Sequence, residues 1–243
     1  MCSLLFHRSK TLLLTFHQSF KFGTRVITAT GGPADHLHVN VLRLVVHKSA
    51  LYWAISPLFS LFPTAVHSFF RSIVPEWFLP EKIVLKKRKD GRDEEFQIEQ
   101  ATYRKLRCLQ GHVVPVFYGE VQVEGTPALL LSDVGGASMG EPGGAKLGNG
   151  TVLGESEFRR IAKQALGALA ACGKSHEDLK LDNFRRVEDE KGESVIMIVD
   201  LEHVDDIESK EKQERIEEGD AKLLADRYRG HLEGMRYDGL LPR

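Results

Sequence analysis

The chain has 243 residues, of which 42% are hydrophobic and 28% charged, so it can bury the core of one large or two small domains. Residues 1–75 carry seven Lys or Arg and one acid, Asp35, so that this part is basic although the whole chain has a net charge of -1. The remainder is acidic and gives no support to nucleic-acid binding. Three scattered cysteines cannot form a disulfide framework or a recognisable zinc site, which favours a reducing, cytoplasmic compartment.

The first part of the chain has two apolar segments of different character. Residues 1–25 combine Arg, Lys, Ser and bulky apolar residues without an acid, the loose pattern of a mitochondrial presequence. Residues 50–70 contain no Lys, Arg, Asp or Glu and are long enough to cross a bilayer, although Pro57 and Pro63 interrupt them. The alternatives are an apolar segment packed on the domain and a poorly ordered extension. We therefore predict a basic, apolar N-terminal extension over residues 1–74, with membrane association as one alternative.

Organised structure is predicted from Pro80 onward. The stretch "KIVLKKRKDGRDEEF" opens with a short apolar run and continues with an Asp-Gly pair, which predicts a strand and a turn. The stretch "DEEFQIEQATYRKLRCLQG" predicts a helix that ends at Gly111. Glu99 lies within the apolar stripe that Phe96 and Tyr103 form on this helix. A carboxylate in that position faces the core and needs a cation.

The following elements alternate between strands and helices. Residues 113–136 contain two strand-like runs around the turn "VEGTP" and end in a Gly-Gly pair that suits a flexible crossing. After a glycine-rich loop, apolar spacing predicts an amphipathic helix that begins near Ser156 and ends near Gly173. The stretch "IESKEKQERIEEGDAKLLADRYRGHL" predicts one solvated, charged helix, followed by a tail.

A polar stretch, "SHEDLKLDNF", follows the amphipathic helix directly. An aspartate at the end of such a loop, Asp178, can accept the hydrogen bond of an attacking hydroxyl, and Asn183 can return to hold a metal near phosphate groups. Asp200 comes directly after an apolar run, so that its carboxylate can meet the same metal from the other side. Taken singly, each of these residues has a plainer interpretation, because Asp and Asn commonly cap turns in loops.

The order of these residues resembles the catalytic core of the protein kinase-like superfamily. The resemblance covers roughly residues 75–206. In detail, this sequence is similar to the small kinase-like proteins of filamentous fungi, which are related to the aminoglycoside and choline phosphotransferases. The run "IVLK" resembles the strand that ends in the ATP-contacting lysine. The residues that carry the resemblance are His176, Asp178, Asn183, Asp200, Leu201 and Glu202, with Lys86 and Glu99 upstream.

The resemblance implies an α+β, two-lobed kinase-like fold with a small antiparallel sheet, an αC-type helix and a reduced helical C-lobe. It places the kinase-like core at residues 75–206 and a charged helical tail at 207–243. It implies ATP and Mg²⁺ as cofactors, a nucleotide and a small hydroxylated compound or other hydroxyl acceptor as partners, and no nucleic acid. The implied catalytic residues are Asp178 and Lys180; the cofactor-binding residues are Lys86, Glu99, Asp133 and Val134; and the metal ligands are Asn183, Asp200 and Glu202.

Departures from the family pattern leave two functions open. Residues 69–82 contain no glycine-rich phosphate loop, and no Ala-Pro-Glu signature follows Asp200. Glu202 stands where protein kinases have glycine, which is closer to the small-molecule phosphotransferases. The first function is an ATP-dependent phosphotransferase acting on a small hydroxylated substrate. The second is an inactive pseudokinase or scaffold, the product of a shortened or degenerate gene. A membrane-tethered interaction protein built around residues 50–70 is a third interpretation.

Overall fold

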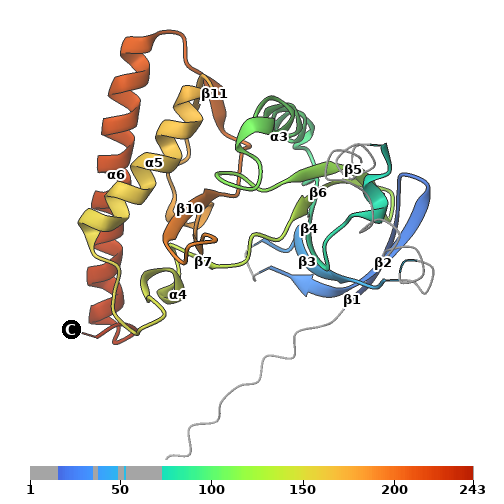
Figure 1. Ribbon diagram of the computed structural model, residues 1–243, viewed down its shortest axis with the longest axis horizontal. Coiled ribbons are helices and arrows are strands. Elements are labelled where there is room, and N and C mark those ends of the chain that lie inside the picture. Colours follow the sequence, from blue (N-terminus) through green and yellow to red (C-terminus); the bar gives the residue numbers. More distant parts are fainter. Residues whose placement is uncertain (1–15, 35–37, 49–51, 53–72, 243) are drawn as a thin grey trace, which may run out of the picture. The chain divides into compact units, whose positions relative to one another are not determined.

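The computed structural model describes residues 16–34, 38–48, 52 and 73–242 (Figure 1). They form two compact units. The first contains the described residues up to Lys87 together with Glu120–Ala128, and the second contains Arg88–Gly119 and the chain from Leu129 onward. The mixture of helices and strands confirms the predicted α+β class.

The two N-terminal segments singled out above lie largely outside the described residues. Residues 1–15 and the apolar run 50–70, apart from Tyr52, are not described, so a presequence and a membrane span there stay predictions. Over the part of the chain that the structure does describe, the helices include none with the length and apolar character needed to span a membrane.

The first unit is built on a closed β-barrel with the strand order β1-β2-β3-β4-β6-β5. Strands β1 to β4 pair antiparallel in sequence order, and the Lys21 to Gln122 pairing of β1 with β5 closes the barrel. The bounds are Phe16–Phe22 for β1, Arg25–Pro33 for β2, Val41–Val46 for β3, Lys82–Lys87 for β4, Phe117–Val123 for β5 and Thr126–Ser132 for β6.

The predicted boundary between an extension and a core at residue 74 does not match this arrangement. Strands β1, β2 and β3 precede the boundary, and β3 pairs directly with β4 beyond it. Residues before the boundary form strands because their side chains alternate with period two: Phe20 and Phe22 are buried, and Lys21 between them is exposed. The same basic and apolar residues suggested a presequence when they were considered only by composition.

A buried carboxylate joins residues from the two sides of the predicted boundary. Glu76 lies in the short 3-10 helix η1 (Pro75–Trp77) and is only 3% exposed. Its Oε1 atom accepts hydrogen bonds from the backbone N–H of Thr24 at 3.1 Å and from the Thr24 hydroxyl at 2.7 Å. A side chain on Gly23, whose φ is +56°, would lie 2.5 Å from the Glu76 carboxyl. The turn between β1 and β2 is therefore fitted to Glu76.

The second unit combines long helices with short strands. The helices are α3 (Asp93–Lys105), α4 (Pro142–Ala145), α5 (Glu155–Ala171) and α6 (Lys210–Tyr237). The strands are β7 (Ala137–Ser138), β8 (Lys174–His176), β9 (Phe184–Glu188), β10 (Ser194–Ile198) and β11 (Val204–Asp206), arranged as a sheet β10-β9-β7 and a pair β11-β8. The predicted strands around "VEGTP" and the predicted helices are confirmed as β5, β6, α3, α5 and α6.

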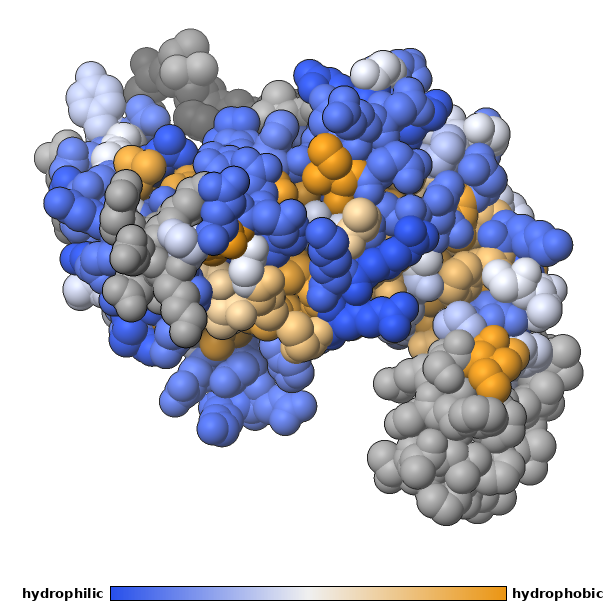
Figure 2. Space-filling view, turned by 90° about the horizontal axis from the view of Figure 1, so that it is seen from above, coloured by the Kyte–Doolittle hydropathy of each residue, from blue (hydrophilic) through white to orange (hydrophobic). Residues whose placement is uncertain are grey.

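Helix α6 is more than the solvated helix that its charge predicted. It lies along α5 (Figure 1), and the ring of Tyr228 packs against Phe158 in a tilted arrangement, with 4.3 Å between the ring centroids, while its hydroxyl donates to the Leu153 carbonyl at 2.9 Å. Apolar residues spaced three and four apart form its buried face: Ala221, Leu224, Ala225, Tyr228, Leu232 and Met235. The predicted separate tail at 207–243 is thus part of the second unit. Figure 2 shows one face of the molecule, on which hydrophilic residues predominate and apolar residues form smaller patches.

Candidate functional site

The loop between β8 and β9 brings Asp178, Lys180 and Asn183 together. The Asn183 amide Nδ2 donates to the Asp178 backbone carbonyl at 2.9 Å and to its carboxylate Oδ2 at 3.2 Å. Lys180 Nζ donates to the same Oδ2 at 2.9 Å. This compact turn includes the 3-10 helix η3 (Leu181–Asn183). The predicted base and the predicted metal ligand are therefore in direct contact.

The protonation of Asp178 follows from these neighbours. Partial burial raises the pKa of Asp178, but the hydrogen bond and positive charge of Lys180, helped by Asn183, outweigh burial and lower this pKa overall. The same hydrogen bond raises the pKa of Lys180. At neutral pH the site thus holds a carboxylate and an ammonium group side by side.

A buried histidine connects this loop to Asp200. His176, 2% exposed, ends β8, and its Nε2–H donates to the Asp200 backbone carbonyl at 2.6 Å. The backbone N–H of Val199 also donates to the Asn183 carbonyl at 3.0 Å. Burial lowers the pKa of His176, so the ring is neutral at pH 7 and Nδ1, which is buried without a hydrogen-bond partner, carries no proton. His176 positions the backbone and is not placed to transfer a proton.

Three carboxylates gather around the end of the Asp200 segment. Glu99 from α3, Asp200 and Glu202 each offer an oxygen atom, and these atoms lie within 4.8 Å of one another. Backbone N–H groups orient two of them, since Glu202 N–H donates to Asp200 Oδ1 at 3.0 Å and Leu201 N–H donates to Glu99 Oε1 at 3.3 Å. Lys89 Nζ contacts Glu202 Oε2 at 3.3 Å.

This arrangement fits a hard divalent cation. Mg²⁺ prefers oxygen ligands, and crowded carboxylates repel one another unless a cation is present. Asn183 donates through Nδ2, which makes Oδ1 the atom suited to a metal. The structure therefore brings Asp200 and Glu202, both predicted metal ligands, together. Glu99, which the sequence analysis predicted as the partner of Lys86, lies beside these two carboxylates. Its place in an apolar stripe was the only signal that its carboxylate is buried.

The remaining predicted site residues occupy other places. Lys86 is 6% exposed in β4 of the first unit, whereas Glu99 belongs to the second unit, so their pairing stays a prediction. Asp133 follows β6, and its Oδ1 accepts the Gly135 N–H at 2.9 Å in a local turn. Val134 lies within that turn. The contact of Asp133 and Val134 with a cofactor also stays a prediction.

Two arginines that the sequence analysis did not select fix the crossing after β6. Arg185 donates to the carbonyl oxygens of Gly135 at 3.0 Å and Gly136 at 2.8 Å. Arg186 is buried and donates to the carbonyl of Gly144 at 2.8 Å. Their place directly after "DNF" gave no signal of this role, because the acceptors are backbone atoms far away in the sequence.

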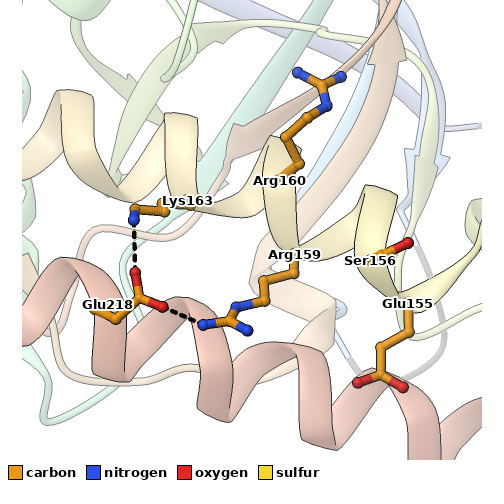
Figure 3. A pocket seen from close by; sticks show the side chains of 6 residues that line it. All are labelled: Glu155, Ser156, Arg159, Arg160, Lys163 and Glu218. Carbon is orange, nitrogen blue, oxygen red and sulfur yellow. Dashed lines mark hydrogen bonds and ion pairs between the residues drawn. The ribbon is translucent and has the colours of Figure 1, made fainter.

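Two pockets lie in the second unit. The smaller, of about 340 Å³, adjoins the carboxylate cluster and is lined by Glu94, Glu95, Ile98, Glu177, Glu202, His203, Val204 and Asp205. The larger, of about 820 Å³, is lined by residues of α5 and α6 and contains none of the predicted site residues (Figure 3). There Glu218 bonds Lys163 at 2.5 Å and also Arg159, while Arg160 pairs with Glu157 instead. Of these two pockets, the smaller is the one placed to serve the candidate site.

No protein-family model matches the chain, and no curated protein matches it. Among solved structures it is similar to the kinase domain of PknI from Mycobacterium tuberculosis. One mutant of that domain shows 14% identity and a TM-score of 0.42 over 68% of this chain and 55% of that chain. A double mutant shows 13% identity and a TM-score of 0.45 over 74% and 62%, respectively. The chain thus spans between half and two thirds of those domains.

Proposed function

We propose that the chain is an ATP-dependent phosphotransferase of the protein kinase-like superfamily that acts on a small hydroxylated substrate. One observation carries this proposal: Asp178 and Asn183 are hydrogen-bonded within a single loop, and His176 ties that loop to the Asp200 carbonyl at 2.6 Å. This arrangement supports the proposal, because phosphoryl transfer needs a base, an amide and a carboxylate positioned near one another.

Asp178 is assigned to the acceptor hydroxyl. Its lowered pKa makes it a weak base, so it first orients the hydroxyl through a hydrogen bond and takes the proton as the bond to phosphorus forms. Lys180, whose ammonium contacts the Asp178 carboxylate, then offsets negative charge on the transferred phosphoryl group. The acceptor is a small molecule on this proposal, because Glu202 gives the Asp-x-Glu pattern that resembles the small-molecule phosphotransferases.

The residues assigned to the metal are Asn183, Asp200 and Glu202, and Glu99 lies beside Asp200 and Glu202. Bound Mg²⁺ supplies positive charge next to the nucleotide phosphates. Within the chain itself, the N–H groups of Leu201 and Glu202 hold the carboxylates in place before the metal arrives. Lys86 is assigned to the inner phosphates with Glu99 as its partner, and Asp133 and Val134 to the rest of the nucleotide.

The alternative is a kinase-like protein without turnover, and one observation favours it. Residues 69–82 contain no glycine that could form a phosphate-binding loop. The β2–β3 hairpin also precedes β4 and does contain glycines. At Gly31, however, an added Cβ would lie 1.9 Å from the Arg43 carbonyl oxygen, so close strand packing explains this glycine without a phosphate group. We therefore assign no described residue of this hairpin to a loop that covers the phosphates.

Nucleotide binding is the first test. The full chain is heated with ATP and Mg²⁺, ATP alone, and Mg²⁺ alone, and the midpoint of unfolding is followed. Residues 16–48 must be kept in the protein that is tested, because they form three strands of the barrel. Ligand at about 100 times its dissociation constant adds about 2.7 kcal/mol to the stability of the folded state. We expect a higher midpoint with ATP and Mg²⁺ together, and a smaller rise in Asp200→Asn. No shift at millimolar ATP in any mixture contradicts nucleotide binding.

A further inference from the structure

Two of the three cysteines, far apart in the sequence, meet in the second unit. The Sγ atoms of Cys108 and Cys172 lie 3.4 Å apart, and both side chains are exposed. Cys108 lies in the 3-10 helix η2 (Arg107–Leu109), which follows α3, and Cys172 caps the C-terminus of α5. The sequence analysis treated these thiols as scattered. The fold corrects that view for this pair.

The proximity is supported by contacts that do not involve sulfur. The Asp206 carboxylate lies 2.7 Å from Lys174 Nζ and 3.9 Å from Lys105 Nζ. Lys105 ends α3 just before Cys108, and Lys174 begins β8 just after Cys172. Asp206 is also paired with Lys174 in the β8–β11 ladder. These contacts place the backbone segments that carry the two thiols near each other.

We propose that Cys108 and Cys172 form a reversible intramolecular disulfide, a redox modification site on the second unit. A disulfide requires an S–S distance of about 2.0 Å, so the two sulfurs need to approach by roughly 1.4 Å. Exposed side chains at the ends of helices can make such a shift by rotating. In a reducing compartment the two thiols are expected to stay free, and the bond forms when the surroundings become oxidising.

The oxidant is a small disulfide such as oxidised glutathione. Partial burial, followed by the hydrogen bond and charge of Cys108, raises the pKa of Cys172, which makes the Cys172 thiolate scarce. Cys108 loses its proton to solvent, and its sulfur attacks the small disulfide, forming a mixed disulfide and releasing one small thiolate. Cys172 then loses its proton and attacks the Cys108 sulfur. This step forms the Cys108–Cys172 bond and releases the second thiolate, so that two protein thiols are oxidised and one small disulfide is reduced.

The bond would link the two segments that carry the carboxylate cluster and the Asp178 loop. Helix α3, which bears Glu99, ends just before Cys108, and β8, which leads to Asp178, begins just after Cys172. Oxidation would therefore fix these segments to each other. It would also close a loop over a sequence separation of 64 residues, which restricts the unfolded chain. The inference does not depend on the proposed phosphotransferase activity.

The test uses the full chain with Cys2→Ser, so that the pair holds the only thiols, in mixtures of reduced and oxidised glutathione. After free thiols are blocked, mass spectrometry should show a loss of about two mass units, for two hydrogens, and a peptide joining Cys108 to Cys172. The midpoint of thermal unfolding should rise by at least about 4 °C on oxidation. Cys108→Ser and Cys172→Ser are the matched controls, and neither should show the rise.

Three results overturn the proposal. The first is that both thiols remain free in oxidised glutathione. The second is that each carries its own glutathione, and the third is that the disulfide joins two chains. A Cys108–Cys172 bond that leaves the unfolding midpoint unchanged contradicts the proposed linking of α3 to β8.

Discussion

The Nε2–H group of His176 donates a hydrogen bond to the backbone carbonyl of Asp200 at 2.6 Å, and His176 directly precedes the loop that holds Asp178. The bond joins the end of β8 to the segment between β10 and β11, next to the ladder in which His176 pairs with Val204 of β11. Because the histidine is buried and neutral, it can set the position of the Asp200 backbone without adding charge to the carboxylate cluster.

His176→Phe keeps a ring against Phe184 but removes the donor to Asp200. We expect a loss of about 1–3 kcal/mol in the free energy of unfolding at pH 7, because the Asp200 carbonyl loses its buried partner. The folded-state pKa of His176 is lowered, so its contribution is present above the unfolded pKa and is lost as pH falls below 6.5. Urea unfolding is therefore measured between pH 5 and 8, a range that includes the unfolded pKa of 6.5. The free energy of unfolding should fall less with decreasing pH in the variant than in the parent chain. Equal pH profiles for both proteins would show that His176 is not a buried neutral group.

Asp178→Asn should lower the rate of ADP release about 10²- to 10⁴-fold and leave nucleotide-dependent stabilisation nearly unchanged. The reason is that Asp178 is assigned to the acceptor hydroxyl, whereas Asn183 and Asp200 are assigned to the metal. ADP release by the parent chain with a pool of hydroxylated metabolites is measured first. Release that continues undiminished in Asp178→Asn contradicts its role, and a parent chain without release supports the inactive alternative.

Glu99→Gln should weaken the stabilisation that Mg²⁺ gives in the presence of ATP, because it removes one of three close carboxylates. Glu233→Gln is the control, since Glu233 is an exposed acid on α6 that lies outside both the cluster and the pocket that adjoins it. Thermal unfolding across a Mg²⁺ titration compares the two. If both variants respond to Mg²⁺ like the parent chain, Glu99 does not contribute to a cation site.

Asp220 provides a pH-dependent test of the second unit. Burial, together with the negative charge of Glu177, raises the pKa of Asp220 to about 6. A raised folded-state pKa means that stability is present below the unfolded pKa of 3.8 and is lost as pH rises through 6. Asp220→Asn should therefore stabilise the chain by about 1–2 kcal/mol at pH 7–8 and by much less near pH 4. A variant that is less stable than the parent chain at pH 8, in urea unfolding, would contradict this environment for Asp220.

Gly31→Ala tests whether the N-terminal strands belong to the folded unit. The new methyl group would meet the Arg43 carbonyl oxygen, at 1.9 Å before any adjustment, so we expect a loss of about 1–3 kcal/mol. Gly148→Ala is the control, because nothing lies within 4 Å of an added Cβ there. Guanidinium unfolding of the two variants makes the comparison. Equal stabilities would indicate that strands β2 and β3 do not pack as described.

The sequence alone determined several local features of the chain beyond Pro80. Apolar spacing located α5, the turn signals placed β5 and β6, and the Asp178 loop stood out because three chemically informative residues lie within a few positions. Local patterns of this kind follow from the helical and strand periods, which depend only on neighbouring residues. The same patterns were present in β1 and β2, but a basic composition without acids drew attention away from their alternation.

Only the tertiary structure decided which distant residues meet. In the fold, the N-terminal strands form a barrel with β4, and α6 packs on α5. Glu99 lies beside Asp200 and Glu202. The fold also brings Cys108 to Cys172, which the sequence separates by 64 positions. Such meetings depend on long-range strand pairing and helix packing, and a short sequence pattern carries no information about which surface another segment will cover. The chemistry of single residues could thus be read from the sequence, whereas the groupings that give them a function had to come from the fold.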